Sequence, residues 1–273
     1  GSSSALVGGQ YNLIGTNGSY AAIIGGYNNY ITGSGYNFIG AGLNNIATSQ
    51  RSAIVTSYGS TASGNSSFIA AGFSNVASGS SSVSMGYKAT SDGHYSMALG
   101  LNANTHGIKG LHAIAPSAAT ASTYKNPQFY KVILTSATER DTESNPVSDQ
   151  YMTTDGASPT RYNSIYIGKT DDTDGRQMYV EGIIKASKVN NTNEYAVYEM
   201  SGIIEGADTS PMRHPTITKK FGESWTIPSI GHAFGSDGSG SSQEWYWNIR
   251  VSPSENDAIL WVAYLTCYVT NAP

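Results

Sequence analysis

One short pattern recurs seven times in the first hundred residues and restricts the fold more than any other feature of the chain. In each copy a small residue is followed by an aromatic residue, a leucine or, in the first copy, a glutamine. Successive copies are 17, 16, 15, 15, 14 and 14 residues apart, at Gly9-Gln10, Gly26-Tyr27, Gly42-Leu43, Ser57-Tyr58, Gly72-Phe73, Gly86-Tyr87 and Gly100-Leu101. A repeat of this length is too short for a helical hairpin and fits one coil of a β-solenoid.

Two further positions keep a constant distance from the small residue of each copy. Three residues before it, an apolar side chain predicts one core position per coil, at Leu6, Ile23, Ile39, Ile54, Ile69, Val83 and Met97. Three residues after it, the chain has Asn12, Asn29, Asn45, Ser60, Asn75, Ala89 and Ala103. Asparagine ladders are typical of stacked strands, so we expect these positions to align. Because one apolar position per coil gives a thin core, neighbouring chains should complete it.

The segments SYAAIIGGYNNYITGSG, SSFIAAGFSNVASGSS and HYSMALGLNANTHG resemble the YadA-like head repeat of trimeric autotransporter adhesins, a repeat that also occurs in phage tail fibres. The resemblance covers about residues 5–107. It implies a left-handed β-roll in which three chains pack side by side, with the apolar positions directed inward. We therefore expect a homotrimer.

The distribution of charge suggests the domain boundaries. Before Lys109 the only charged residues are Arg51, Lys88 and Asp92, whereas the rest of the chain is ordinarily charged. We interpret 1–107 as the solenoid repeats, 108–127 as a connector and 128–273 as a β-rich head. A finer division places a small β subdomain at 128–190 and a β-sandwich at 191–273.

The head is predicted to be all-β, because its apolar segments are rich in β-branched and aromatic residues and turn-forming clusters separate them. The predicted strands lie within 129–135, 162–168, 177–187, 194–206, 216–221, 244–252 and 258–270. In 258–270 both alternating faces are apolar, so we expect this strand to be covered on both sides. Cys267 shares a face with Trp261 and Leu265 and is interpreted as a core residue.

The order of the last strands resembles the C-terminal β-sandwich of phage tail fibres and spikes, which implies that the head contacts the host. In 244–252 the alternation puts Trp245, Trp247, Ile249 and Val251 in the core and leaves the intervening residues on the solvent face. Loops and solvent faces on a rigid scaffold usually carry recognition. The predicted receptor contacts are Tyr246, Asn248 and Arg250, with Asp237, Ser239, Ser242 and Gln243 in the preceding loop.

Composition and charge disfavour several other partners. The net charge is -4 and no cluster of Lys or Arg occurs, so neither nucleic acid nor an anionic lipid surface is expected to bind. The chain has no run of about 18 apolar residues, so no membrane insertion is expected. One cysteine excludes an intrachain disulfide framework, and no cofactor is expected.

We predict no enzymatic activity, because no catalytic motif occurs in a supporting context. Glycoside hydrolysis needs two carboxylates at a set separation, and the head acids are scattered among turns and strand ends. The acids considered are Asp155, Asp171, Asp172, Asp174, Glu181, Glu199 and Glu205. Asp172-Thr173-Asp174-Gly175 lacks the later ligands of a calcium loop and is interpreted as a turn.

The histidines near the connector and the tyrosines of the repeats each allow two interpretations. His106 and His112 flank the connector, and in a trimer each could place three imidazoles around the axis as a metal site; surface or packing histidines are the alternative, and no metal is predicted. Six tyrosines could form an exposed ladder for sugar stacking, or they could pack between chains: Tyr27, Tyr30, Tyr36, Tyr58, Tyr87 and Tyr95.

Together these features favour a trimeric phage tail fibre that recognises a bacterial surface glycan or an outer-membrane protein during attachment. Such a chain would be extracellular on the virion after assembly in the host cytoplasm, and its N-terminal end would contact other fibre or tail proteins. The alternatives are a bacterial trimeric autotransporter adhesin and a tailspike depolymerase that acts on capsule or lipopolysaccharide.

Overall fold

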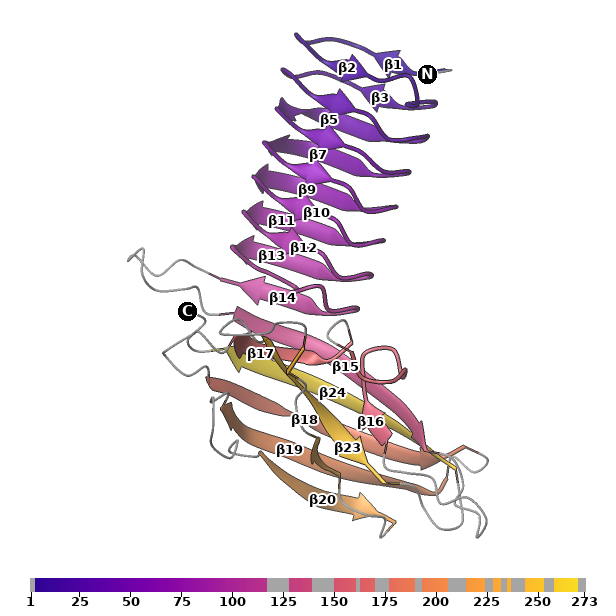
Figure 1. Ribbon diagram of the computed structural model, residues 1–273, viewed down its shortest axis with the longest axis vertical. Coiled ribbons are helices and arrows are strands. Elements are labelled where there is room, and N and C mark those ends of the chain that lie inside the picture. The colour runs from indigo at the N-terminus through magenta and orange to yellow at the C-terminus, as the bar shows by residue number, and fades with distance from the viewer. Residues whose placement is uncertain are drawn as a thin grey trace. The chain divides into compact units, whose positions relative to one another are not determined.

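A computed structural model describes residues 3–116, 128–138, 150–160, 163–169, 177–189, 193–205, 215–223, 228–231, 235–236, 244–252 and 258–269. Within these ranges every regular element is a β-strand, so the predicted all-β class is confirmed (Figure 1). The same ranges contain no helix long and apolar enough to span a membrane. The chain divides into two compact units, 1–118 and 119–273, here called the repeat unit and the head.

The repeat unit is a β-solenoid built from two parallel ladders of strands. One ladder consists of longer strands, in the order β1 (Ala5–Leu6), β3 (Ala22–Ile23), β5 (Phe38–Leu43), β7 (Ala53–Tyr58), β9 (Phe68–Phe73), β11 (Val83–Tyr87), β13 (Met97–Leu101) and β14 (His112–Ala115). The other consists of two-residue strands, β2 (Leu13–Ile14), β4 (Tyr30–Ile31), β6 (Ile46–Ala47), β8 (Thr61–Ala62), β10 (Val76–Ala77) and β12 (Thr90–Ser91). Each coil from β1 to β12 passes once through each ladder.

The strand register confirms the repeat spacing read from the sequence. Gln10 pairs with Tyr27, and Tyr27 pairs with Leu43, at intervals of 17 and 16 residues. From Leu43 the same row continues through Tyr58, Phe73, Tyr87 and Leu101. The aromatic or leucine position of each repeat therefore stacks on its equivalent in the next coil.

The inward row of the long strands matches the predicted apolar positions from Ile23 to Ile69 and departs from them near both ends. In the first coil Leu6 aligns with Ile23 but is 54% exposed, so its prediction as a core position was wrong. Ile39, Ile54 and Ile69 are fully buried and align, but the row then continues through Ser84 and Ala98. The prediction of Val83 and Met97 as core positions was therefore wrong. In the 14-residue coils only one residue, instead of two, separates the core position from the glycine, and the register shifts there. The core residue therefore lies two positions before the glycine, at Ser84, and not three, at Val83.

The solenoid also extends further than the sequence suggested. β14 lies within the expected connector 108–127, yet it pairs in parallel with β13, so that Ala113 stacks on Ala98. Ile108 and Leu111 are fully buried in the same coil. The start of the segment interpreted as a connector is therefore one more coil, whose small and apolar residues fill the solenoid interior.

The head contains two antiparallel groups of strands. The larger sheet has the order β15 (Gln128–Thr138), β24 (Ile259–Val269), β18 (Gln177–Lys188), β19 (Tyr195–Glu205) and β20 (Thr216–Gly222). In the smaller group, β23 (Glu244–Val251) pairs with β16 (Gln150–Met152), β17 (Ile165–Lys169), β21 (Ser229–Gly231) and β22 (Gly235–Ser236). Each predicted head strand is present, and the short β16, β21 and β22 were not predicted.

The larger sheet buries only one of its faces. Along β24 the buried residues alternate strictly with more exposed ones, which is the pattern of a sheet packed on one side. Trp261, Leu265 and Cys267 are buried, as predicted, whereas Leu260 and Tyr264 on the opposite face are exposed. The expectation that this strand is covered on both sides was therefore wrong for the single chain.

Candidate functional site

A buried ladder of polar side chains holds the coils of the repeat unit in register. The Oδ1 atom of Asn29 accepts hydrogen bonds from the backbone nitrogen and the Nδ2 atom of Asn45, each at 3.0 Å. The Oδ1 atom of Asn45 in turn accepts from the backbone nitrogen of Ser60, and Ser60 Oγ accepts from that of Asn75. The predicted ladder is confirmed. Its bonds are internal, so it supports the outer surfaces and offers no binding site itself.

The outer face of the long-strand sheet is apolar along its length. One outward row runs through Phe38, Phe68, Val83 and Met97, which share a register position. The residues that directly follow the buried row form a second, and among them Val55 and Met85 are each 42% exposed. A run of exposed apolar side chains on a stable sheet marks a contact surface.

A third outward row is aromatic and stacked. The rings of Tyr58 and Phe73 lie 4.9 Å apart at an interplanar angle of 7°, and those of Phe73 and Tyr87 lie 4.9 Å apart at 8°. Tyr11 and Tyr27 contact each other edge to face at 5.3 Å. These rings follow the strand spacing because each stands one coil above the last.

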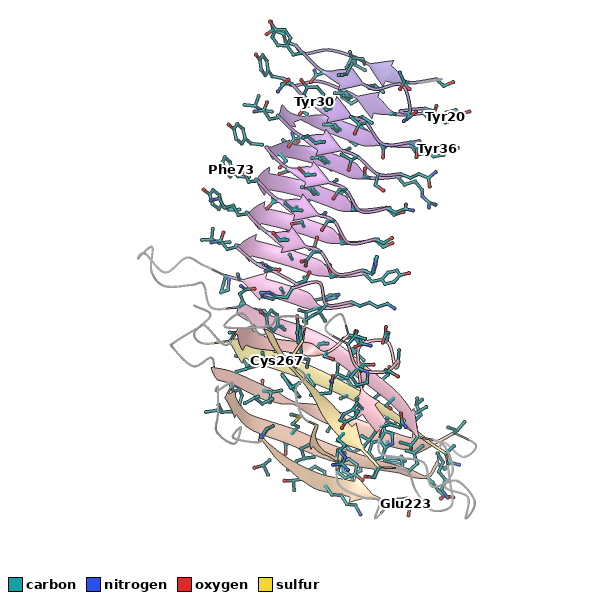
Figure 2. All side chains as sticks on the ribbon, in the orientation of Figure 1. Tyr20, Tyr30, Tyr36, Phe73, Glu223 and Cys267 are labelled. Carbon is teal, nitrogen blue, oxygen red and sulfur yellow. The ribbon has the colours of Figure 1, made fainter. Side chains whose placement is uncertain are left out.

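The six tyrosines considered as a single ladder do not form one. Tyr27, Tyr58 and Tyr87 belong to the row of Phe73, but Tyr36 stacks on Tyr20 in a separate row of turn residues. Figure 2 shows Tyr20 and Tyr36 at the opposite edge of the repeat unit from Phe73. Tyr30 lies in the short-strand ladder and is half-buried, and Tyr95 is an exposed turn residue.

The structure changes the interpretation of the predicted receptor residues. Tyr246 and Asn248 are 2% and 0% exposed, so their expected position on a solvent face was wrong. Both faces of β23 are covered from Tyr246 to Ile249, which the alternating pattern alone did not reveal. The Asn248 amide and the Ser164 hydroxyl are hydrogen-bonded at 3.0 Å, a structural contact. Arg250 is exposed as expected. Asp237, Ser239, Ser242 and Gln243 lie outside the described residues.

The two candidate metal histidines occupy different environments. His106 is half-buried in a turn, where its backbone nitrogen donates to the Asn104 side chain at 2.7 Å. His112 is exposed at the start of β14, on the outward row of Met97. Across the described part of the chain, no three His, Cys, Asp or Glu side chains gather as a metal site. A site shared between chains at these histidines stays a prediction.

Two of the candidate carboxylates, Asp155 and Glu199, have structural partners. Asp155 Oδ1 accepts from the Asn163 side chain at 2.8 Å and from the Ala157 backbone nitrogen at 3.1 Å, which closes a loop. Glu199 forms an ion pair with Lys220. Asp171, Asp172 and Asp174, and with them the predicted Asp-Gly turn, lie outside the described residues, as does the side chain of Glu205.

The sequence missed an exposed face of the larger head sheet, opposite the buried face of Trp261. A shallow groove crosses β18, β19 and β24 there, lined among others by Glu181, Lys185 and Glu199. Large exposed apolar residues line or surround it: Ile133, Tyr179, Ile183, Tyr195, Ile203, Phe221, Leu260, Tyr264 and Tyr268. In the sequence, this surface was indicated by the second apolar face of 258–270, which contains Leu260 and Tyr264. That face was predicted to be covered, so the exposed surface was missed.

Hydrogen bonding and burial shift the pKa values of a few head groups. The Tyr268 hydroxyl donates to Glu181 at 3.0 Å, and this hydrogen bond raises the pKa of Tyr268. Burial raises the pKa of Tyr198 and strongly raises that of the Cys267 thiol. The Cys267 thiol is therefore protonated at neutral pH and is a poor nucleophile.

Comparison with known proteins supports the resemblance of the repeat unit to the YadA head repeat over part of its length. Residues 77–103 match the YadA head domain repeat in two copies, which confirms the resemblance for the stretch from β10 to β13. The curated proteins contain no sequence match to the chain. The tailspike protein of Acinetobacter baumannii phage AM24 is similar at 11% identity and a TM-score of 0.25, over 98% of this chain. The match spans 54% of that tailspike, about half its length. In sequence, 77–103 is thus similar to a YadA-type head repeat.

Proposed function

We propose that this chain is a homotrimeric segment of a bacteriophage tail fibre, extracellular on the virion, whose head binds a bacterial surface glycan or an outer-membrane protein. The observation that carries the proposal is the apolar outer face of the long-strand sheet. This face is regular from coil to coil, and it belongs to the unit that contains the matched repeat.

The exposed rows explain why three chains would associate. Burial of apolar surface contributes about 25 cal/mol per Å² in favour of association, before the entropy lost on association is subtracted. Phe38 and Phe68, each 37% exposed, project from the same register position two coils apart. Since coils repeat at the strand spacing of about 4.8 Å, a neighbouring solenoid can meet the same side chains in every coil. The contact thus adds to the thin core of each chain.

The head supplies the binding part of the proposal. We infer that its two antiparallel groups pack as the predicted β-sandwich, which is supported by the full burial of Trp247 in one and Trp261 in the other. Arg250 and the loop that precedes β23 remain candidate receptor contacts. Three heads on one trimer raise the effective concentration of each site, so weak individual binding can give strong attachment.

A bacterial trimeric adhesin is the second candidate, favoured by the match of 77–103 to the YadA head domain repeat itself. Both candidates share the trimeric solenoid and differ in the surface they bind. Binding of the purified chain to bacterial envelopes supports the fibre, and binding confined to eukaryotic cell surfaces supports the adhesin.

The test is the mass of the full chain in solution, followed by binding to a panel of bacterial surface glycans on the same sample. We expect three times 28.8 kDa and binding without release of shorter oligosaccharides. A stable monomer would refute the trimeric fibre, and release of oligosaccharides would favour the depolymerase.

A further inference from the structure

We propose that the outer face of the larger head sheet is an interface between copies of this chain, formed around the threefold axis of the trimer. This inference rests on the proposed trimeric function and extends it from the repeat unit to the head. It assigns the exposed apolar residues of β15, β24, β18, β19 and β20 to contact with the neighbouring heads.

The first argument is the area of this face. Its large apolar side chains are 38 to 55% exposed in the single chain, with Tyr264 and Phe221 at the upper end. At roughly 200 Å² for a full-sized side chain, they expose on the order of 800 Å² of apolar surface. A standard interface buries about 800 Å² on each partner, so the whole face matches one such contact, and a threefold axis divides it between two neighbours. Monomeric proteins seldom leave so large an apolar patch in water.

The second argument is the order of residues across the sheet. Lys131 on β15 and Glu181 on β18 both pair with Thr266 on the strand between them. This polar row lies between apolar rows, of which one contains Tyr264 and Ile183, paired with each other. The polar groups of this face are therefore confined to a narrow stripe with large apolar side chains on both sides.

The third argument is the complementarity of the charges. Lys131 lies toward one end of the polar row and Glu181 lies two strands further along it. A threefold axis makes heterologous contacts, so two different parts of the row meet where neighbouring chains touch. We expect Lys131 of one copy to approach Glu181 of the next. Opposite charges in this order favour a second copy of this chain as the occupant.

The aliphatic residues argue against a glycan on this face. Ile133, Ile183 and Leu260 are 43 to 53% exposed and have neither a flat ring nor a polar group to hold a sugar. The Tyr268 hydroxyl is already bonded to Glu181. Because the repeat units hold the heads together, even modest contacts would close at the high effective concentration within one trimer.

Cross-linking of the full chain tests this interface. Ser201 on β19 pairs with Glu181 and extends the polar row. Lys131→Cys, Thr266→Cys and Ser201→Cys are made singly on this row, and each is treated with a flexible bis-maleimide. A single exposed cysteine cannot be linked within its own chain, and Cys267 is buried. Ser158→Cys, exposed on the loop after β16, is the matched control. We expect covalent dimers from at least one variant of the row, at a yield independent of protein concentration, and single chains from the control.

The other outcomes overturn the inference in distinguishable ways. If the chain is a trimer by mass but all three row variants behave like Ser158→Cys, the face is not between heads, although the trimeric function stands. If these cysteines react freely and a surface glycan protects them, the face is a glycan site. If the mass is that of a monomer, the proposed function fails, and the interface fails with it.

Discussion

Asn45 lies one coil from Asn29, and the two amides bond directly within the solenoid interior. The Nδ2 atom of Asn45 donates to Asn29 Oδ1 at 3.0 Å and also reaches the carbonyl oxygen of Ser57 at 2.6 Å. The Oδ1 atom of Asn45 accepts from the backbone nitrogen of Ser60 at 3.1 Å. Both asparagines are fully buried. One side chain therefore satisfies groups on the coils before and after it.

Asn45→Ala should destabilise the repeat unit by about 1 to 3 kcal/mol, because it leaves buried polar groups without partners. Asn65→Ala, at an exposed position, is the control and should change stability by less than about 0.5 kcal/mol. Denaturant unfolding followed by circular dichroism, at one fixed protein concentration, measures the difference. Equal midpoints for the two variants would show that the ladder contributes nothing net.

Gly72→Ala should disrupt the stacking of coils. A Cβ atom at Gly72 would lie 1.8 Å from the carbonyl oxygen of Gly86, and the φ of +128° is one that L side chains rarely adopt. We expect a loss of about 3 kcal/mol or more, or failure of the repeat unit to fold. The control is Gly25→Ala, where an added Cβ meets nothing within 4 Å. Thermal unfolding of both variants measures the difference in stability. A Gly72→Ala protein with an unchanged unfolding temperature would contradict the close contact between Gly72 and Gly86.

Val55→Asp should dissociate the trimer without unfolding the single solenoid. Val55 is 42% exposed in the single chain, so an aspartate there is solvated in a monomer but buried and repelled by its neighbours in a trimer. Ser66→Asp, on an exposed turn, adds the same charge away from the apolar face. Light scattering should find a lighter species for Val55→Asp alone. If Val55→Asp still forms intact trimers, the interface lies on another face of the solenoid.

Reversal of single charges should weaken the head interface, and the double reversal should restore it. Lys131→Glu and Glu181→Lys each place like charges where opposite charges are expected to meet, whereas the combined variant exchanges their places. The chain has four tryptophans, all in the head, so their fluorescence reports the unfolding of the head alone. We expect each single variant to lower the unfolding temperature. The double variant should recover the part of the loss that comes from charge repulsion, but not the Tyr268–Glu181 hydrogen bond. Additive losses would indicate that the two side chains do not meet.

The head should lose stability as the pH rises above about 9. Burial raises the pKa of Cys267 above its ordinary value of 9.0, so the folded head keeps the proton that the unfolded chain releases. The stabilising effect of this proton is fully present below pH 9 and is lost above it, by about 1 kcal/mol between pH 7.5 and pH 9.5.

Cys267→Ala tests the source of this pH dependence. The variant should be less stable at pH 7.5, because it leaves a small cavity, but its stability should change less with pH. Urea titrations followed by tryptophan fluorescence at both pH values measure the effect. The same slope in both proteins would show that another group causes it.

The sequence alone determined the solenoid, its coil spacing and the polar ladder. In a parallel stack of coils each position lies on its equivalent one repeat away, so the interval between motifs is the register itself. The intervals between Gln10, Tyr27 and Leu43 are therefore also strand pairings. This relation between interval and register fails where a coil is one residue shorter within its long strand. There Ser84, and not the predicted Val83, occupies the interior position.

Only the tertiary structure decided which faces of the head strands are covered. Alternation along a strand separates its two faces, but burial depends on what another part of the chain brings against each face. Asn248 looked solvent-facing and is buried, whereas Tyr264 looked covered and is exposed. Both differences arise from packing between distant segments, which the period-two pattern of one strand does not encode.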